Sequence, residues 1–212
     1  MTPASQNART DSPQAQLAQT DPVLAEIIET IDLLPLPESK GLYYDLVSCV
    51  LDQQIPARSR GVYVRKLKNI LDSETILPVD VAFLEEESFV DHKIARPKFA
   101  TLQRITQHWQ AQHWEEMDWS PLSDEEVRAA LSEIKGVGPW TVETLLIYSL
   151  GREDAFPVDD YHLKQIMPQL YEFDEESSLK KQMKAKAEQW RPYRSLAVRY
   201  LYAWKDYLKQ QS

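Results

Sequence analysis

Hydrophobic residues recur every three or four positions along most of the chain, a spacing that predicts amphipathic helices rather than strands. One such helix begins near Asp21-Pro22, because an acidic cap followed by proline favours a first helical turn. The same pattern predicts short elements within 79–90 and helices over residues 41–55, 57–71, 96–110, from 123 to the glycines near 136, 139–150, 160–170, 177–189 and 193–209. The sequence therefore predicts an all-α fold.

Three segments mark boundaries in this pattern. Residues 1–20 contain few large apolar side chains, so we expect a flexible N-terminal tail there. Residues 33–40 contain two prolines and are typical of a linker. Glu126 follows Ser123 by three residues, which is the spacing of a capping box at a helix start.

Composition narrows the class of protein. With 212 residues and 43% hydrophobic residues, the chain can form one large domain or two small interlocked ones. Its single cysteine excludes an intramolecular disulfide, a cysteine-ligated zinc and an iron–sulfur cluster, and the four histidines lack metal-ligand spacing. The sequence also lacks a signal peptide and a membrane-spanning run, so we expect an intracellular protein.

The segment Leu131–Gln165 carries the main functional signal. It reads LSEIKGVGPWTVETLLIYSLGREDAFPVDDYHLKQ, which predicts a helix, a tight turn at Gly136 and Gly138, a second helix, and an acid at the start of a third. Backbone N–H groups at such a helix start favour a bound phosphate. The turn therefore indicates DNA binding, although the formal net charge of −9 has the wrong sign for strong non-specific binding.

Four ordered segments, VLDQQIPARS, IKGVGPWTVETLL, FPVDDYHLKQ and WRPYRSLAVRYLYAW, resemble the helix-hairpin-helix DNA glycosylase superfamily. The likeness covers residues 41–204 and is strongest to the 3-methyladenine DNA glycosylase II branch of alkylation repair. It implies a two-lobed helical fold. Residues 41–150 form a central lobe that contains the hairpin at 131–150, and residues 21–40 with 151–212 form a second lobe that carries the catalytic aspartate.

By this resemblance Asp160 is the catalytic residue. A fixed carboxylate stabilises the oxocarbenium-like sugar left by a departing cationic purine, and it can orient the attacking water. Two adjacent acids allow two tasks, so we expect Asp159 to cap the following helix while Asp160 acts in catalysis. The alternative is that these acids only cap that helix.

The resemblance also places aromatic residues in a pocket for the flipped base. Trp140 stands where relatives that nick the DNA backbone carry a Schiff-base lysine, which implies a monofunctional glycosylase without lyase activity. A tryptophan face attracts a cationic alkylated purine. Tyr202 is the expected second aromatic, with Tyr43, Tyr44 and Trp190 as further candidates and packing in the core as the alternative for each.

The remaining DNA contacts follow from the same comparison. Gln54 is the expected wedge that fills the gap left by the flipped base, and Gln53 is expected to be structural. The predicted phosphate contacts come from Lys135, Gly136, Gly138 and Thr141. The backbone carbonyls of Ser132, Ile134 and Val137 would hold a structural monovalent cation, and catalysis would need no cofactor.

The expected function is excision of alkylated purines, of the 3-methyladenine and 7-methylguanine type, from damaged double-stranded DNA in base excision repair. Two alternatives remain open. The protein could bind damaged DNA without turnover, as its acidic charge would favour, or it could remove deaminated or oxidised bases. A monomer without membrane association is expected, because one cleft binds one duplex.

Overall fold

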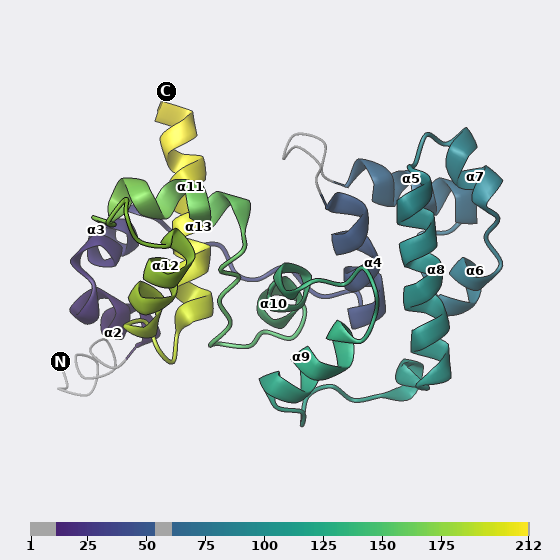
Figure 1. Ribbon diagram of the computed structural model, residues 1–212, viewed down its shortest axis with the longest axis horizontal. Coiled ribbons are helices and arrows are strands. Elements are labelled where there is room, and N and C mark those ends of the chain that lie inside the picture. Colours follow the sequence, from purple (N-terminus) through teal and green to yellow (C-terminus); the bar gives the residue numbers. More distant parts are fainter. Residues whose placement is uncertain (1–11, 54–60, 212) are drawn as a thin grey trace, which may run out of the picture. The chain divides into compact units, whose positions relative to one another are not determined.

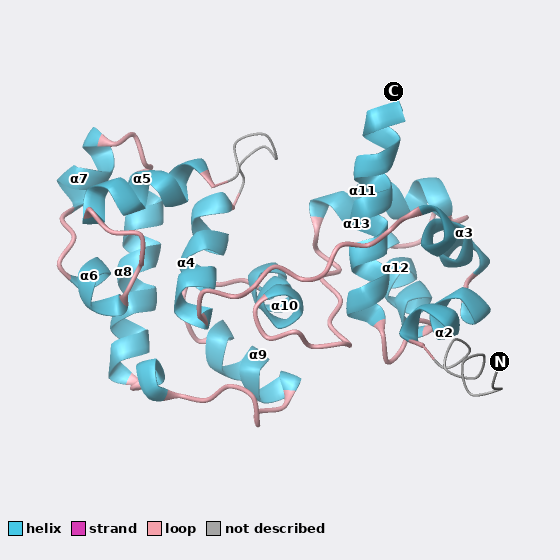
Figure 2. Ribbon diagram, turned by 180° about the vertical axis from the view of Figure 1, so that it is seen from behind, coloured by secondary structure: helices cyan, strands magenta, loops and turns pink. Residues whose placement is uncertain are grey.

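The computed structural model describes residues 12–53 and 61–211, and this part of the chain is helical with no strand (Figures 1 and 2). The all-α prediction is confirmed. The helices are α2 (Pro13–Thr20), α3 (Pro22–Thr30), α4 (Leu42–Asp52), α5 (Val62–Leu71), α6 (Pro78–Ala82), α7 (Glu86–Asp91), α8 (Arg96–Ala111), the 3₁₀ turn η2 (Trp114–Glu116), α9 (Asp124–Ser132), α10 (Pro139–Tyr148), α11 (Tyr161–Leu170), α12 (Leu179–Glu188) and α13 (Arg194–Gln211).

The chain divides into two compact units. The central unit comprises Glu38–Leu150, and the terminal unit combines the chain up to Pro37 with the chain from Gly151 onward. The sequence prediction set the first division three residues later, between residues 40 and 41, and the second at the same place, between 150 and 151.

The central unit is built around α4. Residues Leu46, Val47, Val50 and Leu51 of this helix are buried, which follows from their spacing along one side of the helix. Helix α4 packs against α5, α8 and α10, and α8 supplies Leu102 and Ile105 to the same core. The unit therefore holds the C-terminal end of α4 and the start of α10 on one shared core.

The terminal unit joins the two ends of the chain. Helices α2 and α3 pack against α13, which also packs against α11, so the purple N-terminal helices lie beside the yellow C-terminal helix in Figure 1. Asp21 lies between α2 and α3 and is fully buried. It accepts hydrogen bonds from Trp190 Nε1 at 2.8 Å and from the Tyr171 hydroxyl at 3.1 Å, and it pairs with Lys186 Nζ at 3.0 Å.

The predicted flexible tail is wrong for residues 13–20, which form α2. The Ser12 hydroxyl caps this helix by accepting from the Ala15 N–H at 3.1 Å. Leu17 is only 2% exposed, because the helix packs on α3 and α13. Leu17 is the one buried residue of this helix, and such a sparse pattern is easily mistaken for a tail.

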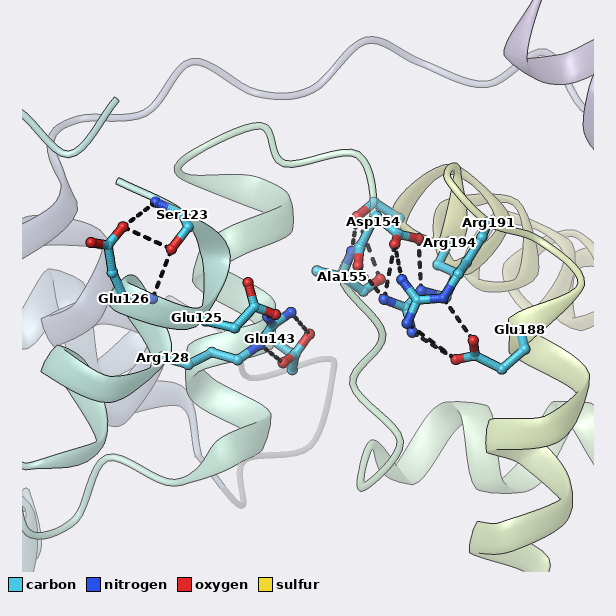
Figure 3. Close-up of polar contacts among 11 residues, drawn as sticks. Ser123, Glu125, Glu126, Arg128, Glu143, Asp154, Ala155, Glu188, Arg191 and Arg194 are labelled. Carbon is cyan, nitrogen blue, oxygen red and sulfur yellow. Dashed lines mark hydrogen bonds and ion pairs between the residues drawn. The ribbon is translucent and has the colours of Figure 1, made fainter. Parts of the chain in front are cut away.

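Most helix boundaries agree with the sequence pattern within a few residues. The capping box is confirmed: Ser123 Oγ accepts from the Glu126 N–H at 3.2 Å, and Glu126 Oε2 accepts from the Ser123 N–H at 2.8 Å (Figure 3). Helix α5 begins at Val62, with Gly61 before it in a left-handed conformation, and residues 57–60 of the helix predicted there lie outside the described residues. The predicted wedge Gln54 lies outside the described residues.

Candidate functional site

The hairpin between α9 and α10 depends on a glycine that no other residue can replace without strain. Gly136 has φ +109°, and a Cβ atom there would lie 2.7 Å from Thr101 Cγ2 on α8. Gly138 differs: its φ is −95°, and a Cβ atom there would meet nothing within 4 Å. Gly136 therefore shapes the turn, whereas Gly138 leaves open space at the start of α10.

Side chains lock the two hairpin helices to each other and to α8. Arg128 on α9 donates to both carboxylate oxygens of Glu143 on α10, at 2.6 and 3.3 Å (Figure 3). Arg104 on α8 donates to the Lys135 carbonyl at 2.9 Å. The Lys135 side chain is exposed, so its ammonium group can reach an anion beside the turn.

The first backbone N–H groups of α10 have no carbonyl partner within the helix, as at any helix N-terminus. Proline stands at the first helical position, and the N-cap residue Gly138 has no side chain to cap the following N–H groups. The helix dipole adds partial positive charge at the same end. This arrangement suits a phosphate oxygen.

Helix α4 ends beside this turn and is held there by two polar contacts. Gln53 Nε2 donates to the Thr141 hydroxyl at 2.9 Å. Lys98 Nζ donates to the carbonyls of Val50, Leu51 and Gln53 at 3.0, 2.8 and 3.0 Å. Burial lowers the pKa of Lys98, while its cation complements the helix C-terminus. No local pattern predicts the Lys98 contact, because it links residues more than forty positions apart.

Thr141 occupies a different position from the one predicted. It is 1% exposed, and its hydroxyl accepts the Gln53 hydrogen bond inside the central unit. The hydroxyl therefore holds the end of α4, and its predicted contact with a DNA phosphate stays a prediction. The sequence did not show this burial, because spacing from the glycines fixes a residue's place on the helix, whereas packing against α4 decides which face is covered.

Asp160 begins α11 in the terminal unit. Its Oδ1 atom accepts from the Leu163 N–H at 2.8 Å, and its own N–H donates to the Pro157 carbonyl at 2.8 Å. The side chain is 4% exposed. A carboxylate has two oxygens with about four acceptor sites, so capping through one oxygen is compatible with a further electrostatic role.

The predicted division of tasks between the two acids is wrong in one respect. The helix cap is Asp160, not Asp159, because the backbone leaves the extended conformation at Asp160 and turns helical at Tyr161. Asp159 instead pairs with Lys180 Nζ at 2.6 Å and with Lys164 Nζ at 3.2 Å. The hydrogen bond from Lys180, reinforced by Lys164, lowers the pKa of Asp159.

A second polar cluster anchors the chain that leads into this turn. Arg194 donates to the Asp154 carboxylate at 2.7 Å and to the Asp154 carbonyl at 2.7 Å, and Arg191 also pairs with that carboxylate (Figure 3). The Ala155 N–H donates to the Ser195 hydroxyl at 2.9 Å. These contacts tie the segment before Asp160 to the start of α13.

Two of the predicted pocket aromatics are only half-buried. Trp140 lies in the first turn of α10 in the central unit. Tyr202 lies on α13 in the terminal unit, the same unit as Asp160, and its ring is 6.4 Å from the His162 ring in an edge-to-face arrangement. His162 follows Asp160 by two residues and also contacts Lys205.

The other predicted pocket aromatics have different surroundings. Trp190 is 0% exposed and donates to Asp21, so it belongs to the core of the terminal unit and the prediction is wrong. Tyr43 is 6% exposed, bonds the Thr106 hydroxyl at 2.7 Å and packs edge-on against Trp109, so most of its ring lies in the core of the central unit. Burial raises the pKa of the Tyr43 hydroxyl. Composition alone does not separate core aromatics from ligand-binding ones.

Tyr43 and Tyr44 line a pocket of about 350 Å³, and Trp140 is not one of its lining residues. Its other walls include Trp109, Trp114 and Trp119 of the central unit. Lys40 and Lys68 already place their ammonium groups 5.2 and 5.7 Å from the Tyr44 ring. The structure thus brings Tyr43 and Tyr44 together at a place separate from the hairpin tryptophan.

Comparison with known families identifies the chain. The model of the HhH-GPD superfamily of base excision DNA repair proteins matches residues 47–192, which is well over half of the 212-residue chain and includes the hairpin and the acidic turn. The protein belongs to the HhH-GPD superfamily. The predicted family is thereby confirmed.

Individual relatives in the HhH-GPD superfamily carry more specific names. DNA-3-methyladenine glycosylase 1 of Schizosaccharomyces pombe is 30% identical over 133 residues, which is 60% of this chain and 57% of that protein. The putative DNA-3-methyladenine glycosylase YfjP of Bacillus subtilis is 36% identical over 81 residues, which is 38% of this chain and 28% of that protein. The chain thus matches less than two thirds of the length of either relative. Both are named as 3-methyladenine glycosylases.

Solved structures of HhH-GPD proteins show the same fold. DNA-3-methyladenine glycosidase of Bacillus halodurans is 25% identical with a TM-score of 0.74, over 92% of this chain and 89% of that one. The Schizosaccharomyces pombe 3-methyladenine DNA glycosylase Mag1, solved in complex with abasic DNA, is 22% identical with a TM-score of 0.74, over 89% of this chain and 94% of that one.

Two further observations concern only the part of this HhH-GPD chain that the structure describes. Its histidine, cysteine, aspartate and glutamate side chains form no group of three or more that could hold a metal ion. None of its helices is both long and apolar enough to cross a membrane.

Proposed function

We propose that this HhH-GPD protein is a DNA glycosylase that hydrolyses the N-glycosidic bond of alkylated purines, of the 3-methyladenine and 7-methylguanine type. The observation that carries the proposal is Asp160, a carboxylate that is fixed at the start of α11 by its bond to the Leu163 N–H and lies within the residues that the family model matches. The names of the curated relatives, at 30% identity or more, support alkylated purines as substrates.

The chemistry needs little from the protein beyond placement and charge. An alkylated purine such as 7-methylguanine is cationic, so it leaves readily as a neutral base. The sugar then acquires oxocarbenium character, which the Asp160 carboxylate stabilises while it orients a water molecule for attack. Reaching the bond requires the nucleotide to leave the DNA stack.

The base would be held by aromatic faces. Trp140 is half-buried at the start of α10, and a tryptophan face attracts a cationic ring. Tyr202, in the same unit as Asp160, is the other aromatic residue that the family resemblance proposes for contact with the base. Because Trp140 stands where lyase-active relatives carry a lysine, the proposed reaction ends with an intact strand and an abasic site.

DNA would be held mainly at the hairpin. The N–H groups at the start of α10, the exposed Lys135 and the open space beside Gly138 suit a phosphate. The wedge into the vacated stack would be Gln54. The carbonyls of Ser132, Ile134 and Val137 would hold a monovalent cation. Ile134 already accepts one bond, from the Val137 N–H at 2.9 Å, and a carbonyl has a second lone pair for a cation.

Base release from methylated duplex DNA is the direct test. The purified protein is incubated with dimethyl-sulfate-treated duplex, released bases are separated by chromatography, and the strands are examined before and after alkali. Free 3-methyladenine or 7-methylguanine, with strand breaks only after alkali, is the expected result. Breaks before alkali would contradict the absence of lyase activity.

The same experiment separates the two other functions. Binding to the methylated duplex without base release would indicate a damage-binding protein, the alternative that the net charge of −9 motivates. Release from duplexes that contain uracil, hypoxanthine or 8-oxoguanine, but not from the methylated duplex, would indicate a different lesion class.

A further inference from the structure

The carboxylate next to the proposed catalytic residue joins three separate elements. Asp159 Oδ2 pairs with Lys180 Nζ at 2.6 Å, and Oδ1 pairs with Lys164 Nζ at 3.2 Å. Lys164 lies on the first turns of α11, and Lys180 lies at the start of α12. Asp159 itself lies in the turn that delivers Asp160, so its side chain ties this turn to two helices.

The turn has another anchor at its opposite end. Arg194 donates hydrogen bonds to the carboxylate and to the carbonyl of Asp154 (Figure 3). The Ser195 hydroxyl accepts a hydrogen bond from the Ala155 N–H. Within the turn, the backbone bonds are short-range, from Val158 N–H to the Phe156 carbonyl at 2.9 Å and from Asp160 N–H to the Pro157 carbonyl at 2.8 Å. Side-chain contacts to neighbouring helices therefore hold both ends of the segment that carries Asp160.

We propose that Asp159, through Lys164 and Lys180, is a positioning residue for Asp160. The inference rests on the proposed function. Its carboxylate fixes the backbone immediately before Asp160 against α12, and the two ammonium groups offset a second negative charge beside the catalytic carboxylate. Catalytic groups must be held within about 0.5 Å of their productive geometry, so a contact of this kind acts on the rate of the chemical step.

An ordinary surface ion pair would predict a different result. The side chain of Asp159 is 35% exposed, and those of Lys164 and Lys180 are 36% and 47% exposed, so these contacts contribute little to folding. Removing them should leave stability and DNA affinity nearly unchanged. A selective loss of the excision rate is therefore the distinguishing observation.

The test measures single-turnover base release from methylated duplex with protein in excess, and the dissociation constant for the same duplex separately. Asp159→Asn, which keeps the size and removes the charge, is expected to slow release about 10-fold, since misplaced catalytic groups cost between one and two orders of magnitude. The dissociation constant is expected to stay within about two-fold and the thermal midpoint within about 3 °C. Asp159→Glu should recover most of the rate.

Coupling to Lys180 provides the sharper criterion. If the two residues act through one contact, Asp159→Asn combined with Lys180→Met should be no slower than the slower single variant. Glu74→Gln is the control, because it removes the exposed carboxylate of another ion pair, with Lys68 at 2.9 Å in the central unit. It should leave the release rate unchanged.

The outcomes separate the inference from the proposed function. Release by Asp159→Asn at the wild-type rate, independent effects of the two substitutions, or a loss confined to DNA affinity would each overturn the positioning role and leave the glycosylase proposal standing. Absence of base release by the wild-type protein would overturn the glycosylase proposal and this inference together.

Discussion

The Gln53 side-chain amide donates to the Thr141 hydroxyl at 2.9 Å, joining the end of α4 to the first turn of α10. One residue ends the helix that leads toward the proposed wedge, and the other lies beside the glycine turn. The contact therefore couples two parts of the proposed DNA-contacting surface, within a single unit of the fold.

Removing this contact should cost stability. Thr141→Val keeps the side-chain shape but removes the hydroxyl from a residue that is 1% exposed, so we expect the free energy of unfolding to fall by about 1 kcal/mol. Thr141→Ser keeps the hydroxyl and serves as the control. Urea unfolding measures both. Equal stability of the valine variant and the wild type would show that the hydrogen bond contributes nothing.

Asp160→Asn should separate folding from catalysis. Asparagine caps a helix about as well as aspartate, so the bond to Leu163 and the free energy of unfolding should be nearly retained. The loss of the carboxylate charge should lower single-turnover base release by at least about 10²-fold. Normal release in a variant with a normal unfolding curve would contradict the proposed mechanism.

The two hairpin glycines should respond differently to alanine. Gly136→Ala places a side chain at φ +109° and 2.7 Å from Thr101, so we expect a loss of about 2 kcal/mol or more in unfolding free energy. Gly138→Ala has ordinary φ and open space, and should cost at most about 1 kcal/mol as a weaker N-cap. DNA affinity should fall in both variants. An unstable Gly138→Ala protein would speak against this assignment.

We expect a substitution at Trp140 to change the rate of base release rather than the stability of the protein. Trp140→Ala removes the proposed cation–π face, and we expect about 10-fold slower release of 7-methylguanine, with partial activity in Trp140→Phe. Inhibition of base release by free methylated bases, neutral or cationic, then tests the proposed cation–π contact. Equal sensitivity to both classes of base would argue for simple packing.

Asp21 should be one of the most sensitive positions for stability. It is 0% exposed, and one oxygen accepts from Tyr171 and Trp190 while Lys186 pairs with the same oxygen. Asp21→Asn would place an amide among these donors and leave the half-buried Lys186 ammonium without its carboxylate, so we expect a loss of about 3 kcal/mol or more. Chemical unfolding at neutral pH measures this loss in the free energy of unfolding.

Asp21 should also make stability depend on pH. Burial acts to raise the pKa of Asp21, but the hydrogen bonds from Trp190, Lys186 and Leu24 together outweigh it and lower the pKa below its ordinary value. A depressed folded-state pKa contributes stability above the unfolded pKa of about 3.9, and this contribution is lost as pH falls through the folded value. The difference in stability between wild type and Asp21→Asn should therefore shrink below about pH 4. A constant difference down to pH 2 would contradict this linkage.

Local sequence signals located most helices because their causes are local. Pro22 in a first turn, the Ser123–Glu126 capping box and the regular apolar spacing of α4 each depend on residues within one or two turns. Helix α2 was missed for the opposite reason, since Leu17 is buried only by docking on α3 and α13.

The candidate site was predictable to the extent that it follows the chain. The glycine turn and the acidic turn are contiguous motifs, and the sequence located both. The sequence could not assign the cap to Asp160 or recognise that Trp190 and Tyr43 are core residues. These facts depend on the backbone conformation at one residue and on contacts with Asp21 and Thr106, far away along the chain.

By itself, the sequence determined the helical class, the hairpin and the acid at the start of α11, because periodicity, glycine and capping chemistry act over short distances. Only the tertiary structure decided which aromatic and polar side chains are covered, and which lysines stand beside Asp159. Burial and ion pairing depend on segments that meet only after folding, and no local pattern records which segments those are.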